Sequence, residues 1–459
     1  MSQPGTAVSS ISPSARPVSL IRLLAFFLPL GLSASLVTIS HVIINSTLAR
    51  SSTPELVIAS YAIAMSLLAI TERPAVLLRQ TCSALVRDRI SFRAMRTVAY
   101  VVFGCITVAG GLVSYSPLGV WIFTYFFGVE PDRVPDVIAV YRILMWVSLF
   151  SGVRCLYHGL IIFNRRTTWL TIGMVIRLVG MYSLAQYFIR TDQVTSGRVG
   201  AIIFLTGMII ECLISFLEGT VLLKKRIPEK LEDHPIERKG EVFTFYRPLL
   251  YSSFLAVVVG PSINAILGKT SDMELSIAAF AIAASLTQLV QSFFSYIHQI
   301  VLNFYRADRD QVIRFTLLLC LIPTILLGTL SYTAAGPWFM THLMGVNEQL
   351  MTASLHTLRI FMIMTLIFPW LDFCNGILML NGQTKIMVWS QACNVSVTLI
   401  TLFLCLGFHP EWNARIGALA QSLGVAAELA AAAWVLRKTA AEQRLAASIT
   451  ANHSPTSRK

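Results

Sequence analysis

Charged residues are scarce in this sequence. Only 13% of its 459 residues are Asp, Glu, Lys or Arg, whereas a soluble domain carries roughly a quarter. The sequence also lacks an H-E-x-x-H motif, a Walker loop, a G-x-S-x-G motif and zinc-ligand spacing, which argues against the common metalloenzymes, hydrolases and ATP-driven pumps. Its eight cysteines contain no C-x-x-C pair. We therefore expect no enzyme, no catalytic or metal site, no cofactor and no disulfide framework.

Apolar residues dominate instead. They make up 55% of the chain, and the mean hydropathy is +0.68. Runs of about 20 apolar residues can cross a bilayer as helices, so the sequence predicts an all-α polytopic membrane protein. The twelve expected spans are residues 22–49, 54–79, 95–118, 136–163, 167–189, 199–223, 244–268, 275–303, 313–335, 352–380, 384–408 and 415–437. Segment 118–127 is too short to span and is expected to end the third span or lie at the interface.

The basic residues gather in alternate loops. The formal net charge is +13, and Lys and Arg crowd the loops after every second span, whereas the other loops hold mostly acids. By the positive-inside rule both termini are cytoplasmic, in the plasma membrane, and the same topology explains the basic loops without nucleic acid. Residues 1–19 lack the apolar core of a cleavable signal peptide, and residues 1–21 are expected to form a cytoplasmic N-terminal tail. The polar tail, residues 438–459, is expected to be disordered.

The chain repeats itself. Residues 29–80 match residues 248–299 in the same direction and without a gap, and the match continues at a nearly equal offset to Glu211 and Glu428. We expect two six-span lobes, 22–223 and 244–437, joined by the charged linker 224–243. An even number of spans gives both lobes the same orientation, so they are related by an axis along the membrane normal. Such a pair predicts a central opening and alternating access.

Polar residues inside the spans are costly and are candidate site residues. The candidates for substrate binding are Arg154, Arg177, His158, His41, Asn45, Asn264 and Arg359. An arginine fork suits carboxylate or phosphate oxygens, which favours an anionic substrate. The alternatives are that Arg359 extends to the membrane surface, that Arg154 and Arg177 pair with acids inside their lobe, and that the asparagines only join helices.

Acids inside the spans are candidates for ion coupling, because a carboxylate in a low-dielectric site can exchange a proton near neutral pH. They are Glu72, Glu211, Asp372 and Glu428. The alternative is ion pairing within a lobe, for instance between Glu211 and Arg177. Prolines inside spans, such as Pro323 and Pro369, are either static kinks or hinges.

Scattered stretches resemble the progressive ankylosis branch of the MOP exporters. They are LIRLLAFFLPLG and N-x-x-L-A in the first span, ASYAIAMSL in the second, FTFYRPL opening the seventh, LRIF in the tenth and G-A-L-x-x-S-L-G-V-A-A-E-L in the last. The loop RQTCSALVRDRISFRAMR lacks the signature of the major facilitators. The resemblance implies a V-shaped, MATE-like pair of lobes and export of pyrophosphate, citrate or related anions. It carries Asn45, Arg359 and Glu428 over as site or structural positions.

The sequence departs from drug-extruding MATE proteins, because the first span holds no acid and only His41. We therefore expect a secondary exporter of small anionic solutes, coupled to H⁺ or Na⁺, that works as a monomer in the bilayer. The alternatives are proton- or sodium-coupled extrusion of cationic drugs, or flipping of lipid-linked saccharides. A membrane enzyme or a non-transporting scaffold fits less well, because no catalytic cluster is visible and both halves carry polar residues inside the membrane.

Overall fold

The computed structural model describes residues 18–48, 50–52, 54–127, 129–232, 234–343 and 348–452, which form helices joined by short loops. The first half of the chain contains α1 (Leu20–Leu48), α2 (Pro54–Thr71), α3 (Arg73–Leu85), α4 (Arg89–Tyr115), α5 (Pro117–Trp121), the π-helix η1 (Ile122–Phe126), η2 (Pro131–Arg133), α6 (Val134–Phe163), α7 (Thr168–Arg190) and α8 (Gly197–Lys225). The second half contains α9 (Lys239–Leu267), α10 (Met273–Phe294), α11 (Ile297–Phe304), α12 (Arg309–Tyr332), α13 (Ala335–Trp338), the π-helix η3 (Phe339–Leu343), α14 (Glu348–Leu380), α15 (Thr384–Phe408), η4 (Pro410–Trp412) and α16 (Ala414–Asn452).

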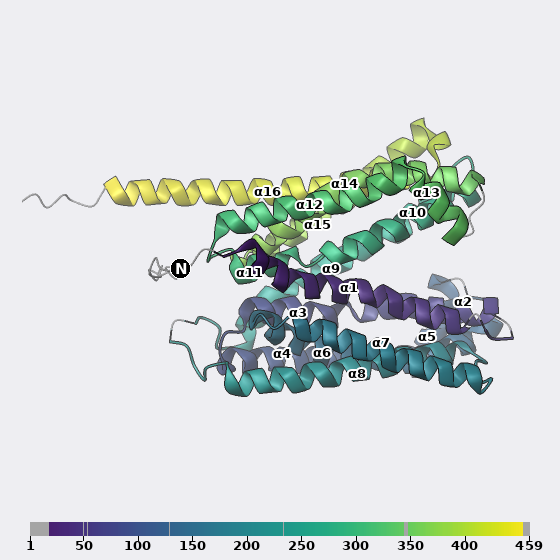
Figure 1. Cartoon of the computed structure of the whole chain (residues 1–459), viewed down its shortest axis with the longest axis horizontal. Coiled ribbons are helices and arrows are strands. Elements are labelled where there is room, and N and C mark those ends of the chain that lie inside the picture. Colours follow the sequence, from purple (N-terminus) through teal and green to yellow (C-terminus); the bar gives the residue numbers. More distant parts are fainter. Residues whose placement is uncertain are drawn as a thin grey trace, which may run out of the picture.

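The helices form two lobes with the same internal packing (Figure 1). In the N-lobe, α1 to α8, helix α6 packs against α3, α4 and α8. In the C-lobe, α9 to α16, helix α14 packs in the same way against α11, α12 and α16. The start of α1 and the end of α16 lie at one end of the molecule (Figure 1), which we call the basal end, and the opposite end is the distal end. The parallel six-span repeat expected from the sequence is therefore confirmed.

The expected spans are also confirmed in number and place. The described residues contain 11 helices long and apolar enough to cross a membrane, or 12 if one bent pair counts as a span. That pair is α2 and α3, which meet at an angle of 42°. The bend lies beside Pro74, whose missing N–H leaves a helical carbonyl without its donor. Pro29, Pro323 and Pro369 lie inside helices that continue past them.

Aspartates fix where several helices begin. The side chains of Asp88, Asp272 and Asp308 accept hydrogen bonds from the backbone N–H three residues later, at 2.8, 3.2 and 3.1 Å. This N-cap satisfies one of the donors that a helix start leaves unpaired. The caps start α4, α10 and α12 at the loops, so the apolar runs that follow lie within the spans.

The short apolar segment 118–127 is a separate element and not a continuation of the third span. The α-helix α4 stops at Tyr115, and α5 with η1 follows it. The C-lobe repeats this arrangement in α13 and η3, after α12. At each break the chain approaches itself so closely that a Cβ at Gly119 or Gly336 would overlap a backbone carbonyl of the preceding helix. Glycine is therefore required for both turns.

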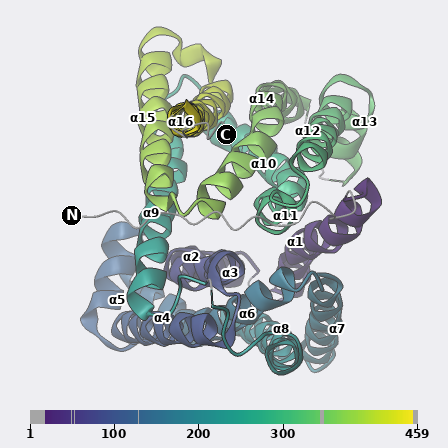
Figure 2. The same cartoon turned by 90° about the vertical axis from the view of Figure 1, so that its left-hand side faces the viewer.

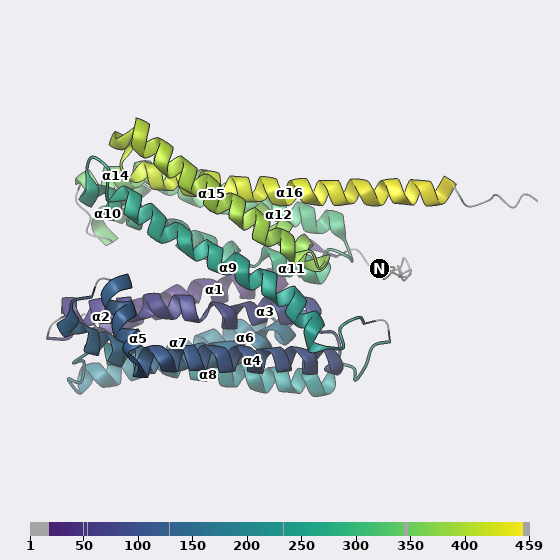
Figure 3. The same ribbon diagram turned by 180° about the vertical axis from the view of Figure 1, so that it is seen from behind.

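The lobes meet at the basal end and diverge toward the distal end (Figures 1 and 3). The first turns of α1 cross to the C-lobe, where Phe26 and Phe27 join a buried cluster with Phe304 and Phe315. The first turns of α9 cross the other way (Figure 2), where Tyr246 packs in an N-lobe cluster. The opening of the V therefore faces the distal end.

The C-terminal tail differs from expectation. Helix α16 does not stop near Lys438 but continues to Asn452, so the expectation of disorder is wrong for residues 439–452. Alanine, glutamine, leucine and arginine in this stretch are good helix formers, which explains why a polar segment remains helical. Residues 1–17 and 453–459 lie outside the described residues.

Candidate functional site

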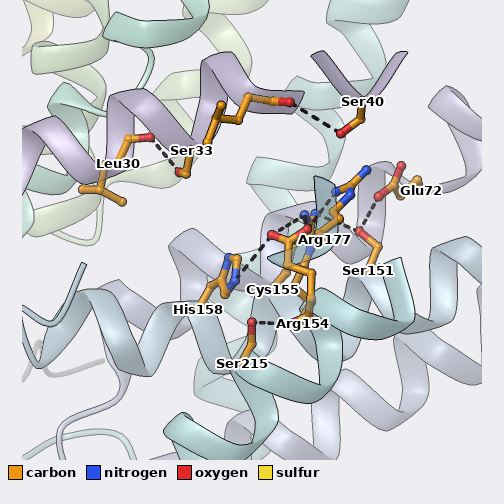
Figure 4. A network of polar contacts seen from close by, with 12 residues as sticks. Leu30, Ser33, Ser40, Glu72, Ser151, Arg154, Cys155, His158, Arg177 and Ser215 are labelled. Atoms are coloured by element: carbon orange, nitrogen blue, oxygen red, sulfur yellow. Dashed lines mark hydrogen bonds and ion pairs between the residues drawn. The ribbon is translucent and has the colours of Figure 1, made fainter. Parts of the chain in front are cut away.

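A buried cluster of charged side chains lies in the middle of the N-lobe, around the carboxylate of Glu211 in α8. Arg154 Nη1 in α6 donates to both carboxylate oxygens at 3.0 Å, and Arg177 Nη1 in α7 donates to Oε2 at 2.7 Å. His158 Nε2, one turn after Arg154, lies 3.8 Å from Oε1. Figure 4 shows that Arg154, Arg177 and His158 point toward the same position. Four of the sequence candidates thus form one site.

The cluster extends to a fifth candidate through a serine. Arg154 Nη2 donates to the hydroxyl of Ser151 at 3.2 Å, and this hydroxyl donates to the carboxylate of Glu72 at the bend between α2 and α3 (Figure 4). Glu72 and Glu211 are therefore both engaged by donors of their own lobe. The in-lobe pairing that the sequence left as an alternative for Arg154 and Arg177 is what the structure contains.

These contacts leave some of the buried N–H donors of Arg177 without a hydrogen-bond partner. Arg177 is 1% exposed, yet its Nε and Nη2 atoms have no hydrogen-bond partner. Its guanidinium lies over the ring of Phe204, 5.2 Å from the centroid, and the ring of His41 packs against the same phenylalanine at 5.5 Å. His41 is thus separated from the cluster by one aromatic ring. Spare arginine donors at such depth are suited to an additional acceptor.

The equivalent acid of the C-lobe has no cation. Glu428 in α16 is 6% exposed and accepts a hydrogen bond of 2.7 Å from Asn394 Nδ2. By the repeat offset, Asn394 is the residue equivalent to Arg177. Leu371 and Asn375 are equivalent to Arg154 and His158. Within the described residues no salt bridge involves Glu428. A carboxylate is costly to bury without a cation, so this acid differs chemically from Glu211.

The basic residues at the outer ends of α6 and α14 have a structural contact. Arg359 Nε and Nη2 donate to the carbonyl of Ser331 at 3.2 Å, and its guanidinium lies 4.8 Å from the ring centroid of Tyr332. The repeat equivalent, Arg142, donates to the carbonyl of Ser114 at 3.0 Å and covers Tyr115. Each arginine caps the last turn of the preceding span, where the helix dipole favours a cation.

We expect Arg359→Gln and Arg142→Gln each to lower the free energy of unfolding by about 1 kcal/mol, because each removes a charged cap from one helix end. Detergent-solubilised protein titrated with SDS would measure this loss. Transport by both variants should stay near wild type. A folded Arg359→Gln protein that no longer transports, beside an active Arg142→Gln protein, would show that Arg359 contacts substrate after all.

The remaining acid candidate lies at the closed seam between the lobes. The backbone N–H of His298 in α11 donates to Asp372 at 2.8 Å, and its ring Nδ1 lies 3.0 Å from the same carboxylate. His298 Nε2 lies 3.0 Å from the amide of Gln299, which accepts a hydrogen bond of 2.8 Å from Ser83 Oγ in the N-lobe. Asp372 therefore takes part in joining the lobes. Asn45 and Asn264 are exposed residues of α1 and α9.

One residue that the sequence analysis did not select stands out in the structure. Arg73, the first residue of α3, is exposed, and its side chain forms no hydrogen bond or ion pair with any described residue. Leu77 and Ala84 follow it on the same helical face and pack against a C-lobe cluster that includes Phe245 and Leu249 of α9. Arg73 thus lies one turn distal to the inter-lobe contact, on the face turned toward the C-lobe. No sequence pattern marks Arg73. It stands out only by its position at the bend between α2 and α3 and by its exposed side chain.

Comparisons with known proteins identify the fold. No protein-family model and no curated protein sequence matches this chain. A MOP superfamily transporter from Pyrococcus furiosus is 14% identical, with a TM-score of 0.71 over 92% of this chain and 96% of that one. A multidrug resistance MATE family transporter in an outward-facing conformation is 13% identical, with a TM-score of 0.71 over 94% and 99%. The VcmN MATE transporter of Vibrio cholerae, in a bent form, is 14% identical, with a TM-score of 0.71 over 91% and 97%. This chain therefore has the fold of the MATE transporters of the MOP superfamily.

Proposed function

We propose that this chain is a secondary transporter that exports a small anionic solute, such as pyrophosphate, citrate or a related organic acid, by alternating access. The proposal assigns the basal end to the cytoplasm of a plasma-membrane protein, because the basic loops lie there. The lobes of residues 22–223 and 244–437 would rock about the basal seam. The protein would act as a monomer and belong to the progressive ankylosis-like branch.

The preference for an anion rests on Arg73. Its guanidinium is exposed and unpaired on the face of α3 that is turned toward the C-lobe. The neighbouring acid, Glu72, is engaged by Ser151, and Glu211 is engaged by two arginines. The N-lobe therefore offers free positive charge at the opening and no free carboxylate from this cluster. A guanidinium fork binds carboxylate and phosphate oxygens with two parallel hydrogen bonds.

The fold leaves the polarity of the substrate open, so the side chains must decide it. The Pyrococcus furiosus protein is described as having a binding pocket of reverse polarity that suggests a different function, while another neighbour is a multidrug resistance transporter. The favoured second candidate is proton- or sodium-coupled extrusion of cationic drugs, since Glu428 is a buried acid without a cation. Flipping of lipid-linked saccharides is a third.

Arg73→Gln should lower transport of labelled pyrophosphate or citrate by about tenfold or more in proteoliposomes, because it removes the free charge that meets the anion. Arg73→Lys should retain part of the activity. The matched control is Arg93→Gln, an exposed arginine of α4.

Unchanged anion flux in Arg73→Gln protein with a wild-type unfolding midpoint would reject the anion site. Resistance of expressing cells to cationic drugs, abolished by Glu428→Gln and unaffected by Arg73→Gln, would establish the second candidate instead.

A further inference from the structure

A cavity of about 860 Å³ lies at the basal end, below the seam that joins the lobes. Its wall comes from the end of α3, the linker between the lobes, the start of α9, the α11–α12 loop and the start of α15. We call it the basal pocket. Its wall includes Arg87, His234, Glu241, Arg306, Thr384 and Lys385. Its volume is in the range of small-molecule sites, and it is separate from the cluster around Glu211.

The charge of the basal pocket is strongly unbalanced. Arg87 from the N-lobe and Arg306 and Lys385 from the C-lobe face a single acid, Glu241. That acid is already occupied, because its carboxylate accepts backbone N–H groups of Glu237 and Arg238 at 2.8 and 3.0 Å. None of the three cations forms a salt bridge within the described part of the chain.

Arg87 is held in place as a fixed charge. Its guanidinium donates to the carbonyls of Ser83, Val86 and Ala84 at 2.8 to 2.9 Å and lies 4.3 Å from the ring centroid of Phe163. The pKa of Arg87 is lowered to about 10, chiefly by burial; Cys82 opposes this shift, and repulsion from Arg306 makes a smaller contribution in the same direction as burial. Two cations from different lobes therefore repel each other across the pocket.

Neutral donors add to this positive site. Helix α15 begins in the pocket wall at Thr384, and Gln383 before it gives no side-chain hydrogen bond to the first turn. The positive end of the dipole of this 25-residue helix thus lies in the same wall as Lys385. His234 Nε2 forms a hydrogen bond of 2.9 Å with the carbonyl oxygen of Leu85. This contact holds the linker between the lobes against the end of α3.

We propose that the basal pocket binds a polyanion carrying phosphate groups, and that this ligand bridges the lobes and favours the conformation closed at the basal end. Its phosphate groups supply negative charge between Arg87 and Arg306. They also accept hydrogen bonds from Lys385 and from the N-terminus of α15. The phosphates come either from a soluble cytoplasmic compound or from an anionic lipid headgroup. This site goes beyond the proposed transport function, because its ligand is held and not carried.

The test uses the full-length protein in nanodiscs of neutral phosphatidylcholine. Inorganic tripolyphosphate is titrated by calorimetry, and in a second arm phosphatidic acid is added to the nanodisc and the unfolding midpoint is measured. We expect one arm to show binding, and Arg306→Gln and Lys385→Gln each to weaken it by about tenfold. Binding in the first arm identifies a soluble ligand, and stabilisation only in the second identifies a lipid.

The controls separate this pocket from general surface charge and from transport. Arg309→Gln removes an exposed cation three residues from Arg306 that does not line the pocket, and Arg73→Gln removes the charge assigned to transport. Arg309→Gln should bind like wild type, and Arg73→Gln should keep the binding that Arg306→Gln weakens, because it can remove only tripolyphosphate held at the transport site. An absence of response in both arms, or an equal loss in Arg309→Gln or Arg73→Gln, overturns the proposal. Transport of anions by the wild-type protein has no bearing on this outcome.

Discussion

Glu211→Gln is expected to lower the free energy of unfolding by about 3–5 kcal/mol, the usual cost of removing one partner of a buried ion pair. The carboxylate of Glu211 receives donors from both Arg154 and Arg177, and neither arginine can reach water, because both are less than 10% exposed. The amide leaves the two buried arginines without a directly bonded carboxylate. Glu72 is reached from Arg154 only through the hydroxyl of Ser151. SDS titration in detergent measures the change.

The repeat supplies a matched control for this prediction. Glu428→Gln changes the same residue type at the equivalent position, but Glu428 meets only Asn394. An amide can still accept this hydrogen bond, so the loss should stay below about 1 kcal/mol. Arg177→Asn copies the C-lobe arrangement and keeps the contact between Arg154 and Glu211, so it should fall between the two. Equal unfolding free energies for Glu211→Gln and Glu428→Gln would contradict an ion-paired core in the N-lobe.

The second large effect is expected in transport. Here the replacement of Glu428 has the large effect, whereas for stability it is the replacement of Glu211. We propose that Glu428 carries the coupling proton, because it is a buried acid whose hydrogen-bond donor, Asn394, is an uncharged amide. Glu428→Gln should therefore fold normally but lose the stimulation of transport by an imposed pH gradient, by about tenfold or more. Proteoliposomes loaded with labelled pyrophosphate and given an inward or outward pH step measure this response.

An arginine variant provides the comparison for this coupling experiment. Arg142→Gln removes a helix-end cap far from Glu428 and should keep a full response to the pH step. A sodium gradient tested in parallel identifies the other coupling ion. If Glu428→Gln protein responds to pH as wild type does, proton coupling lies elsewhere, and Asp372 at the inter-lobe seam is the next acid to replace.

The sequence by itself determined the architecture of this protein. Long apolar runs can satisfy their backbone groups in lipid only as helices, and this alone located the spans. The internal match between residues 29–80 and 248–299 established two similarly oriented lobes. Scarcity of charge inside the spans also reduced the site to a few residues, and four of these, Arg154, His158, Arg177 and Glu211, do lie together.

Only the tertiary structure decided which partner each of these residues has. The spans are apolar on every side, because lipid and lobe interior accept the same residues, so no periodicity marks the inward face of α6, α7 or α8. Their relative rotation brings both arginines to Glu211, leaves Glu428 with an amide, and turns Arg73 toward the other lobe. Arg87, Arg306 and Lys385, distant in sequence, meet only because the lobes close at the basal end.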